Sequence, residues 1–170
     1  MKKYSGYTLI SKACESGYTL IEVLVSLTII GLLFGFGFVS FRDFSRREHL
    51  TSVARSIKGE MRLIQSKASA GEKPDDVNCN GANTLSSYSF QIVSATSYQI
   101  IANCLGGSVV IKSASLADDI SMASSQNTIS FKVLGQGTDI PQGADAIITF
   151  TQAGTNNVTI VTVTSGGEIK

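Results

Sequence analysis

Few side chains in this sequence have types and spacings that could carry out chemistry. His49 is the only histidine and lies in a segment with a helical pattern, so the serines of the C-terminal half have no histidine to activate them. One histidine and three cysteines are too few for most zinc sites. Asp75-Asp76 and Asp118-Asp119 lack the D-x-D-x-D-G spacing of a calcium loop, so solvated loop charges are favoured over calcium ligands. We therefore expect no enzyme, no metal and no cofactor.

Glu22 is the one chemically unusual residue that remains, because it borders a long apolar segment. Residues 23–41 contain no charge and, as a helix, are about 28 Å long, close to the thickness of a bilayer's hydrocarbon core. A buried core helix is disfavoured because such helices rarely stay apolar on every face for five turns. A cleaved secretory signal is disfavoured because its apolar part is shorter and ends in small residues. We expect a membrane-spanning helix.

The glutamate and the glycines of this segment each allow two interpretations. A carboxylate near the bilayer centre costs about 2.5–3.5 kcal/mol, less at the interface, and no Lys or Arg lies within one turn of Glu22. Either Glu22 begins the helix and faces lipid headgroups, favoured by the helix dipole, or something else supplies its partner. Gly31 and Gly35 have the small-xxx-small spacing that lets helices approach closely, but glycine is also common in membrane helices.

Charge is distributed unevenly along the chain. Residues 1–17 sum to +2, residues 42–73 to +4 and residues 74–170 to −4, for a net charge of +1. A chain that is 43% hydrophobic and only 16% charged is not a disordered charged tail. The acidic C-terminal part offers no basic stripe, so no nucleic-acid partner is expected. The arginines at 42–47 are interpreted as a collar facing solvent and headgroups rather than as a binding site.

The segment SGYTLIEVLV, residues 16–25, resembles the N-terminal motif of type IV pilins and pseudopilins. Four features coincide: a charged leader, a glycine, an aromatic residue, and a glutamate four residues later within an apolar run. The resemblance implies that prepilin peptidase removes residues 1–17 by cutting between Gly17 and Tyr18. It also implies N-methylation of Tyr18 and a role for Glu22, the fifth mature residue, in assembly.

A repeat in the sequence offers two positions for this cut, since SGYTLI occurs at 5–10 and again at 16–21. Cutting after Gly6 leaves Ser11 where the glutamate belongs, with Lys12 and no apolar run behind it. Cutting after Gly17 meets every requirement and is the cut we expect.

The resemblance also supplies expectations for partners and location. The methylated amine of a neighbouring subunit is the expected partner of Glu22, because the chain's own amine is not free to fold back onto it. The partners are then prepilin peptidase, other pilin or pseudopilin subunits, an inner-membrane assembly platform and, before assembly, membrane lipid. The chain is expected in the bacterial inner membrane with its head in the periplasm, and then in a pilus or type II secretion pseudopilus. The alternative is a membrane-tethered extracytoplasmic binding module.

The rest of the chain predicts an α+β fold. Residues 18–41 form the transmembrane half of a helix, which also builds the filament core. Residues 42–70 form its amphipathic stem, with an apolar stripe at Leu50, Val53, Ala54, Ile57, Met61, Ile64 and Ala68. Residues 71–170 form a β-rich head of about six short strands, mainly antiparallel, whose inner face covers the stripe. The last hairpin resembles that of minor, H-type pseudopilins and favours a minor subunit.

Two cysteines remain once the implied leader, which contains Cys14, is removed. Export to an oxidising compartment then favours a disulfide between Cys79 and Cys104. Two free buried thiols are the alternative.

Overall fold

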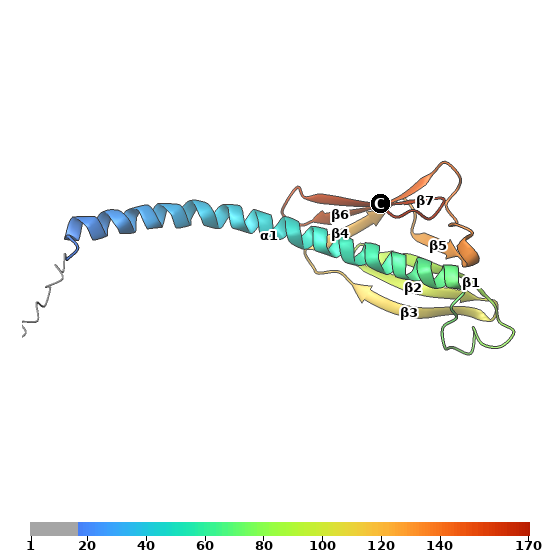
Figure 1. The fold of residues 1–170 in the computed structure, drawn as a ribbon. Coiled ribbons are helices and arrows are strands. Elements are labelled where there is room, and N and C mark those ends of the chain that lie inside the picture. Colours follow the sequence, from blue (N-terminus) through green and yellow to red (C-terminus); the bar gives the residue numbers. More distant parts are fainter. Residues whose placement is uncertain (1–16) are drawn as a thin grey trace, which may run out of the picture. The chain divides into compact units, whose positions relative to one another are not determined.

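The computed structural model describes residues 17–170, apart from the side chains of residues 36–40, and shows an α+β fold (Figure 1). Helix α1, Leu20–Ala70, is followed by seven strands. The chain divides into two compact units after Asp43. The predicted leader lies outside the described residues except for Gly17.

The C-terminal end of α1 is set by glycine. Gly71 has a φ of +65°, a left-handed conformation that glycine adopts without a steric penalty. Its N–H donates to the carbonyl of Ala68 at 3.0 Å, and the N–H of Glu72 donates to that of Lys67 at 3.0 Å. These two bonds form a Schellman motif, which satisfies carbonyls that the helix end would otherwise leave unpaired. The helix ends at Ala70 for this reason.

In the first unit, the apolar side chains of α1 are exposed. Leu20 is 83% exposed, Leu24 55% and Phe34 75%. A Cβ built on Gly31 or Gly35 meets no other atom within 4 Å. Across the described part of the chain, no helix combines the length and the apolar character needed to cross a membrane.

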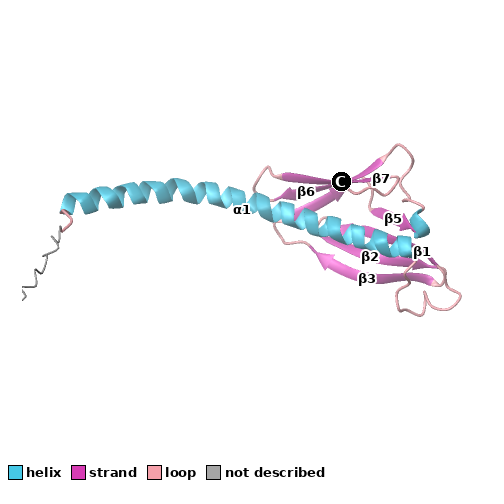
Figure 2. Cartoon of the chain, in the orientation of Figure 1, coloured by secondary structure: helices cyan, strands magenta, loops and turns pink. Residues whose placement is uncertain are grey.

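In the second unit, the strands form two antiparallel sheets with α1 lying along them (Figures 1 and 2). One sheet has the order β3-β2-β1-β5 and the other the order β4-β6-β7. The first contains β1 (Leu85–Ser94), β2 (Ser97–Cys104), β3 (Gly107–Ser115) and β5 (Thr128–Lys132), and the second contains β4 (Ile120–Ser124), β6 (Asp145–Gln152) and β7 (Val158–Thr164). A short 3₁₀ helix, η1 (Val133–Gly135), follows β5.

The expectation of about six strands sharing one inner face is wrong in two respects. There are seven described strands, and they form two sheets. The missed strand is β4, whose sequence ISMAS contains little of the β-branched and aromatic composition typical of strands. It is held by tertiary contacts, because Ile120 and Met122 are buried and Met122 pairs with Phe150 of β6.

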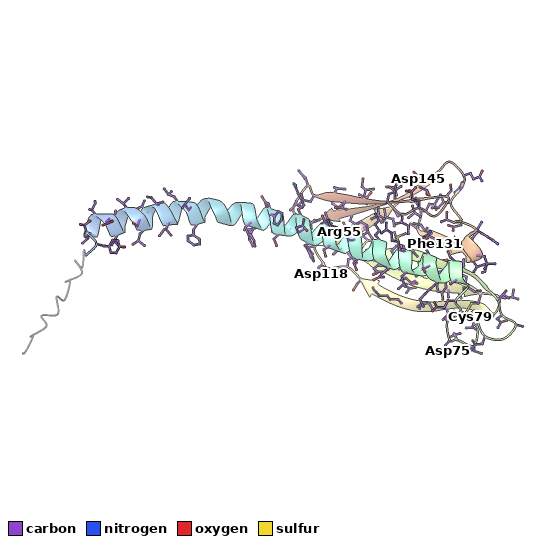
Figure 3. The ribbon with its side chains drawn as sticks, in the orientation of Figure 1. Arg55, Asp75, Cys79, Asp118, Phe131 and Asp145 are labelled. Carbon is purple, nitrogen blue, oxygen red and sulfur yellow. A yellow bond between two sulfur atoms is a disulfide. The ribbon has the colours of Figure 1, made fainter. Side chains whose placement is uncertain are left out.

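One hydrophobic core joins the helix to both sheets. The predicted stripe is buried along residues 50–68, except that Val53 is only partly buried. Aromatic side chains fill the space against it, and Phe131 is visible among them in Figure 3. Phe90 of the first sheet and Phe150 of the second are both fully buried. The stripe therefore packs against side chains from two sheets.

Polar contacts fix the helix at the border of this core. Glu60 accepts a hydrogen bond from Tyr98 Oη at 2.9 Å and pairs with Lys112 Nζ at 2.5 Å. Burial, together with the hydrogen bond to Glu60, raises the pKa of Tyr98 well above its ordinary value. The C-terminal segment is held in the same way, because Arg62 donates to the carbonyl of Ile169 and Gln65 to that of Gly167.

Met61 allows a direct test of this core. It is fully buried in the middle of the stripe, so Met61→Ala should lower the free energy of unfolding by about 2–5 kcal/mol through lost contacts and a cavity. The measurement is urea unfolding of residues 44–170, which contain every residue of the core. Leu63→Ala is the matched control, because Leu63 lies two positions away on the same helix and is 56% exposed. Equal losses in the two variants would show that the stripe is not the face that packs.

Candidate functional site

The predicted processing site lies at the start of α1, where the chain changes from non-helical to helical. Gly17, Tyr18 and Thr19 are not helical, and α1 begins at Leu20. Tyr18 is 82% exposed, and a Cβ on Gly17 meets no other atom within 4 Å. The Gly17–Tyr18 bond is therefore exposed and outside the helix.

Thr19 is the N-cap of the helix. Its Oγ1 accepts a hydrogen bond from the N–H of Glu22 at 3.3 Å, and its carbonyl accepts from the N–H of Val23 at 3.2 Å. A threonine three residues before a glutamate is the sequence pattern of a capping box, and this signal was available in TLIE, residues 19–22. The residues expected to matter in the motif were Gly17, Tyr18 and Glu22, and the capping role of Thr19 was not predicted.

Glu22 lies in the first turn of α1, where the helix dipole favours a negative charge. Its side chain is exposed, and among residues 17–170 no cationic side chain forms an ion pair with it. The next polar residues of the apolar run are satisfied by their own helix. Ser26 Oγ donates to the carbonyl of Glu22 at 2.7 Å, and Thr28 Oγ1 donates to that of Leu24 at 2.8 Å. Glu22 is therefore the only described side chain between residues 20 and 35 that carries a charge.

Comparison with protein families places a known motif on this segment. Residues 12–38 match the family described as the prokaryotic N-terminal methylation motif. The chain carries a prepilin-type methylation motif. This motif is the hallmark of type IV pilin-like and pseudopilin-like prepilins, and it implies processing by a peptidase and assembly with other pilin subunits. No curated protein and no solved structure matches the chain.

The matched segment encloses Gly17, Tyr18 and Glu22, the residues proposed for cleavage, methylation and assembly. The motif covers the N-terminal part of the chain alone.

Cys79 and Cys104 are joined in a disulfide, with their Cα atoms 5.2 Å apart. Cys79 is fully buried, and it lies with Asp75 in the loop that follows α1 (Figure 3). The bridge ties this loop to the end of β2. Cys14 lies outside the described residues.

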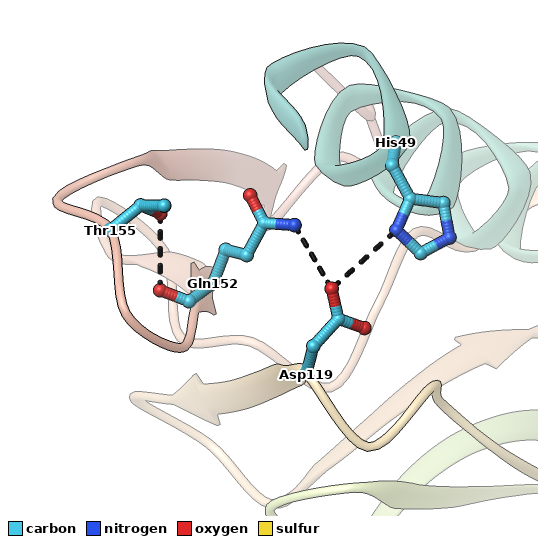
Figure 4. Close-up of polar contacts among 4 residues, drawn as sticks. All are labelled: His49, Asp119, Gln152 and Thr155. Atoms are coloured by element: carbon cyan, nitrogen blue, oxygen red, sulfur yellow. Dashed lines mark hydrogen bonds and ion pairs between the residues drawn. The ribbon is translucent and has the colours of Figure 1, made fainter. Parts of the chain in front are cut away.

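His49 of α1 lies beside Asp119 of the head (Figure 4). Its Nδ1 lies 3.8 Å from Asp119 Oδ2, which also accepts a hydrogen bond from Gln152 Nε2 at 3.0 Å. The hydrogen bond from Gln152, assisted by the nearby His49 and Arg46, holds the pKa of the Asp119 carboxyl below its ordinary value. The expectation of a merely solvated Asp119 was therefore incomplete, and no spacing in the sequence pointed to Gln152.

This His49–Asp119 contact does not resemble a catalytic or metal site. Both side chains are about half exposed, and no nucleophile is hydrogen-bonded to His49 in the described structure. Asp75 and Asp118 lie at opposite ends of the second unit (Figure 3), so the two acidic pairs do not combine. Within residues 17–170, no group of three or more His, Cys, Asp or Glu side chains is placed to hold a metal ion.

The disulfide is expected to stabilise the second unit. Replacing both Cys79 and Cys104 with Ala should lower the free energy of unfolding by about 3 kcal/mol, because the unfolded chain regains the entropy of a loop of 25 residues. The measurement is urea unfolding of residues 44–170 with and without reductant. Reductant should destabilise the natural sequence and leave the double variant unchanged. An unfolding midpoint of the natural sequence that is insensitive to reductant would contradict a structural bridge.

Proposed function

We propose that this protein is a structural subunit of a type IV pilus or a type II secretion pseudopilus, processed after Gly17 and assembled through residues 18–41. The observation that carries the proposal is the methylation motif at residues 12–38, which coincides with an exposed, non-helical Gly17–Tyr18 bond directly before a helix. A peptidase can reach an exposed bond that lies outside a helix.

The exposure of the apolar helix supports assembly. Side chains such as Leu20, Phe34 and Ile21 are more than 60% exposed in the isolated chain, and burial of apolar surface is favourable by about 25 cal/mol per Å². A structural role follows if lipid covers these side chains first and the same segment of other subunits covers them afterwards. The inner membrane, with the head in the periplasm, is then the location before assembly.

Glu22 is proposed to select the position of the neighbouring subunit. In low dielectric, two opposite charges a few Å apart attract strongly, and the methylated amine of Tyr18 in another subunit is the cation that the motif provides. Within this assignment a minor subunit is favoured, and that choice depends only on the likeness of the β6–β7 hairpin to H-type pseudopilins.

The first test is the identity of the mature N-terminus. Mass spectrometry of the protein purified from its own host should find an N-methylated Tyr18 as the first residue. An intact Met1 or a cut near residue 45 would overturn the proposal and favour a tethered binding module or a secreted protein.

The second test separates assembly from folding. Glu22→Ala should reduce incorporation into filaments at least tenfold, because an unpaired buried charge in an assembly costs about 3–5 kcal/mol, while the membrane level of the mature subunit stays unchanged. Immunoblots of sheared filaments and of membranes measure both quantities. Glu48→Ala is the matched control, since Glu48 is an exposed glutamate on the same helix beyond the apolar run. Normal incorporation of Glu22→Ala refutes the role of Glu22.

A further inference from the structure

Asn80 and Gly81 form the only Asn-Gly pair in the sequence. They lie in the loop between α1 and β1, in which Figure 3 labels Asp75 and Cys79. An Asn-Gly pair has a reaction of its own, in which the backbone nitrogen of the glycine attacks the side-chain carbonyl carbon of the asparagine. Glycine permits this attack because it has no Cβ to obstruct it. Contacts in the folded protein decide whether the pair is free to react.

Both reacting groups of this pair are free in the structure. Asn80 is exposed, and among residues 17–170 its side chain forms no hydrogen bond. In the same described part of the chain, the N–H of Gly81 donates to no carbonyl. A Cβ built on Gly81 would meet no other atom within 4 Å, so the space around the attacking nitrogen is open.

The backbone at this pair forms an exposed turn. The N–H of Asn83 donates to the carbonyl of Asn80 at 3.2 Å, and Gly81, with a φ of +62°, is the second residue of the turn. A positive φ at this position is typical of turns that favour glycine. Residues 80–82 are all exposed, so a rotation of the Asn80 side chain toward the Gly81 nitrogen displaces no side chain of the core.

Other asparagines of the second unit lack this combination. Asn156 is also exposed, but the nitrogen that would attack it belongs to Asn157, whose N–H donates to Thr155 Oγ1 at 3.3 Å. Asn83 is packed closely, since a Cβ built on Gly106 would lie 2.4 Å from Asn83 Nδ2. The structure therefore distinguishes Asn80 from its neighbours by contacts as well as by sequence.

We propose that Asn80 is a site of spontaneous modification, at which the side-chain amide is converted to isoaspartate and aspartate. The Gly81 nitrogen forms a bond to Cγ of Asn80, the Cγ–Nδ2 bond breaks, and ammonia leaves with the proton from the Gly81 nitrogen. The product is a cyclic imide. Water then adds to one of its two carbonyl carbons and breaks the bond from that carbon to the Gly81 nitrogen. Addition at the main-chain carbon gives isoaspartate, and addition at Cγ gives aspartate.

The surroundings of Asn80 suit a charged product. The modification adds one negative charge to a loop that already contains Asp75 and Asp76. Lys73 Nζ donates to the carbonyl of Gly81 at 3.3 Å, so a cation lies beside the new carboxylate and partly offsets the repulsion. The modification is separate from filament assembly and does not depend on leader processing, because the site belongs to the second unit alone.

The test incubates the full chain in detergent at pH 8.5 and locates changes by mass spectrometry with peptide fragmentation. Residue 80 should gain about 1 Da, the difference between an amide and an acid, and should become a substrate of isoaspartyl methyltransferase. The rate should be within tenfold of that of the same chain reduced and unfolded in urea, because no native contact protects the pair. A native rate more than tenfold lower overturns the proposal, and so does a change at Asn83 or Asn156 that is as fast as at Asn80.

Variants of the chain test the attacking atom. Gly81→Ala should slow the reaction at residue 80 at least tenfold, because its methyl group obstructs the nitrogen. Gly143→Ala is the matched control, since Gly143 also has a positive φ, +81°, and open space around a built Cβ, and it should leave the rate unchanged. Equal rates in the two variants refute attack by the Gly81 nitrogen.

A second variant does not depend on the backbone of the turn. Asn80→Gln keeps the amide but would need a six-membered ring, so it should remove the methyltransferase signal from the whole chain. A signal that persists in this variant places the reaction elsewhere and overturns the proposal.

Discussion

Burial of one helical stripe by two sheets is the interaction on which the second unit depends. The buried side chains along residues 50–68 of α1 belong to the same core as side chains of both sheets. Among the described residues, neither sheet has another element of comparable length to pack against. A β-sheet buries its apolar face only by packing that face against another element. The helix therefore makes one cooperative body of the two sheets, and its border contacts at Glu60, Arg62 and Gln65 fix the helix in place against them.

The periodic parts of this arrangement could be predicted from the sequence, because local patterns encode them. The stripe has a period of 3.6 residues, and the end of α1 follows from a glycine that can take a left-handed conformation. Six strands stood out by their β-branched and aromatic content. Strand β4 could not be recognised in this way, because it is stabilised by pairing with β6, about 30 residues later in the chain. The division into two sheets could not be predicted either, because it depends on which strands pair.

The candidate sites also differ in whether a short segment of the sequence encodes them. The order of Gly17, Tyr18 and Glu22 is legible in the sequence because the methylation motif is a short linear segment. The capping role of Thr19 is encoded just as locally, by its spacing to Glu22. The contact between Asp119 and Gln152 joins residues far apart in the chain, so no spacing could reveal it.

The N-terminal geometry also bears on the two interpretations of Glu22. Its place in the first turn of α1, next to the Thr19 cap, fits the view that it simply starts the helix. The helix dipole contributes about 0.3–1 kcal/mol there, whereas an ionised carboxylate deep in an apolar phase costs about 2.5–3.5 kcal/mol. The dipole therefore offsets only a fraction of that cost. The start of the helix explains how Glu22 is tolerated at an interface. Under the proposed assembly, which buries the segment among apolar helices, a cation from a neighbouring subunit would offset the rest of the cost.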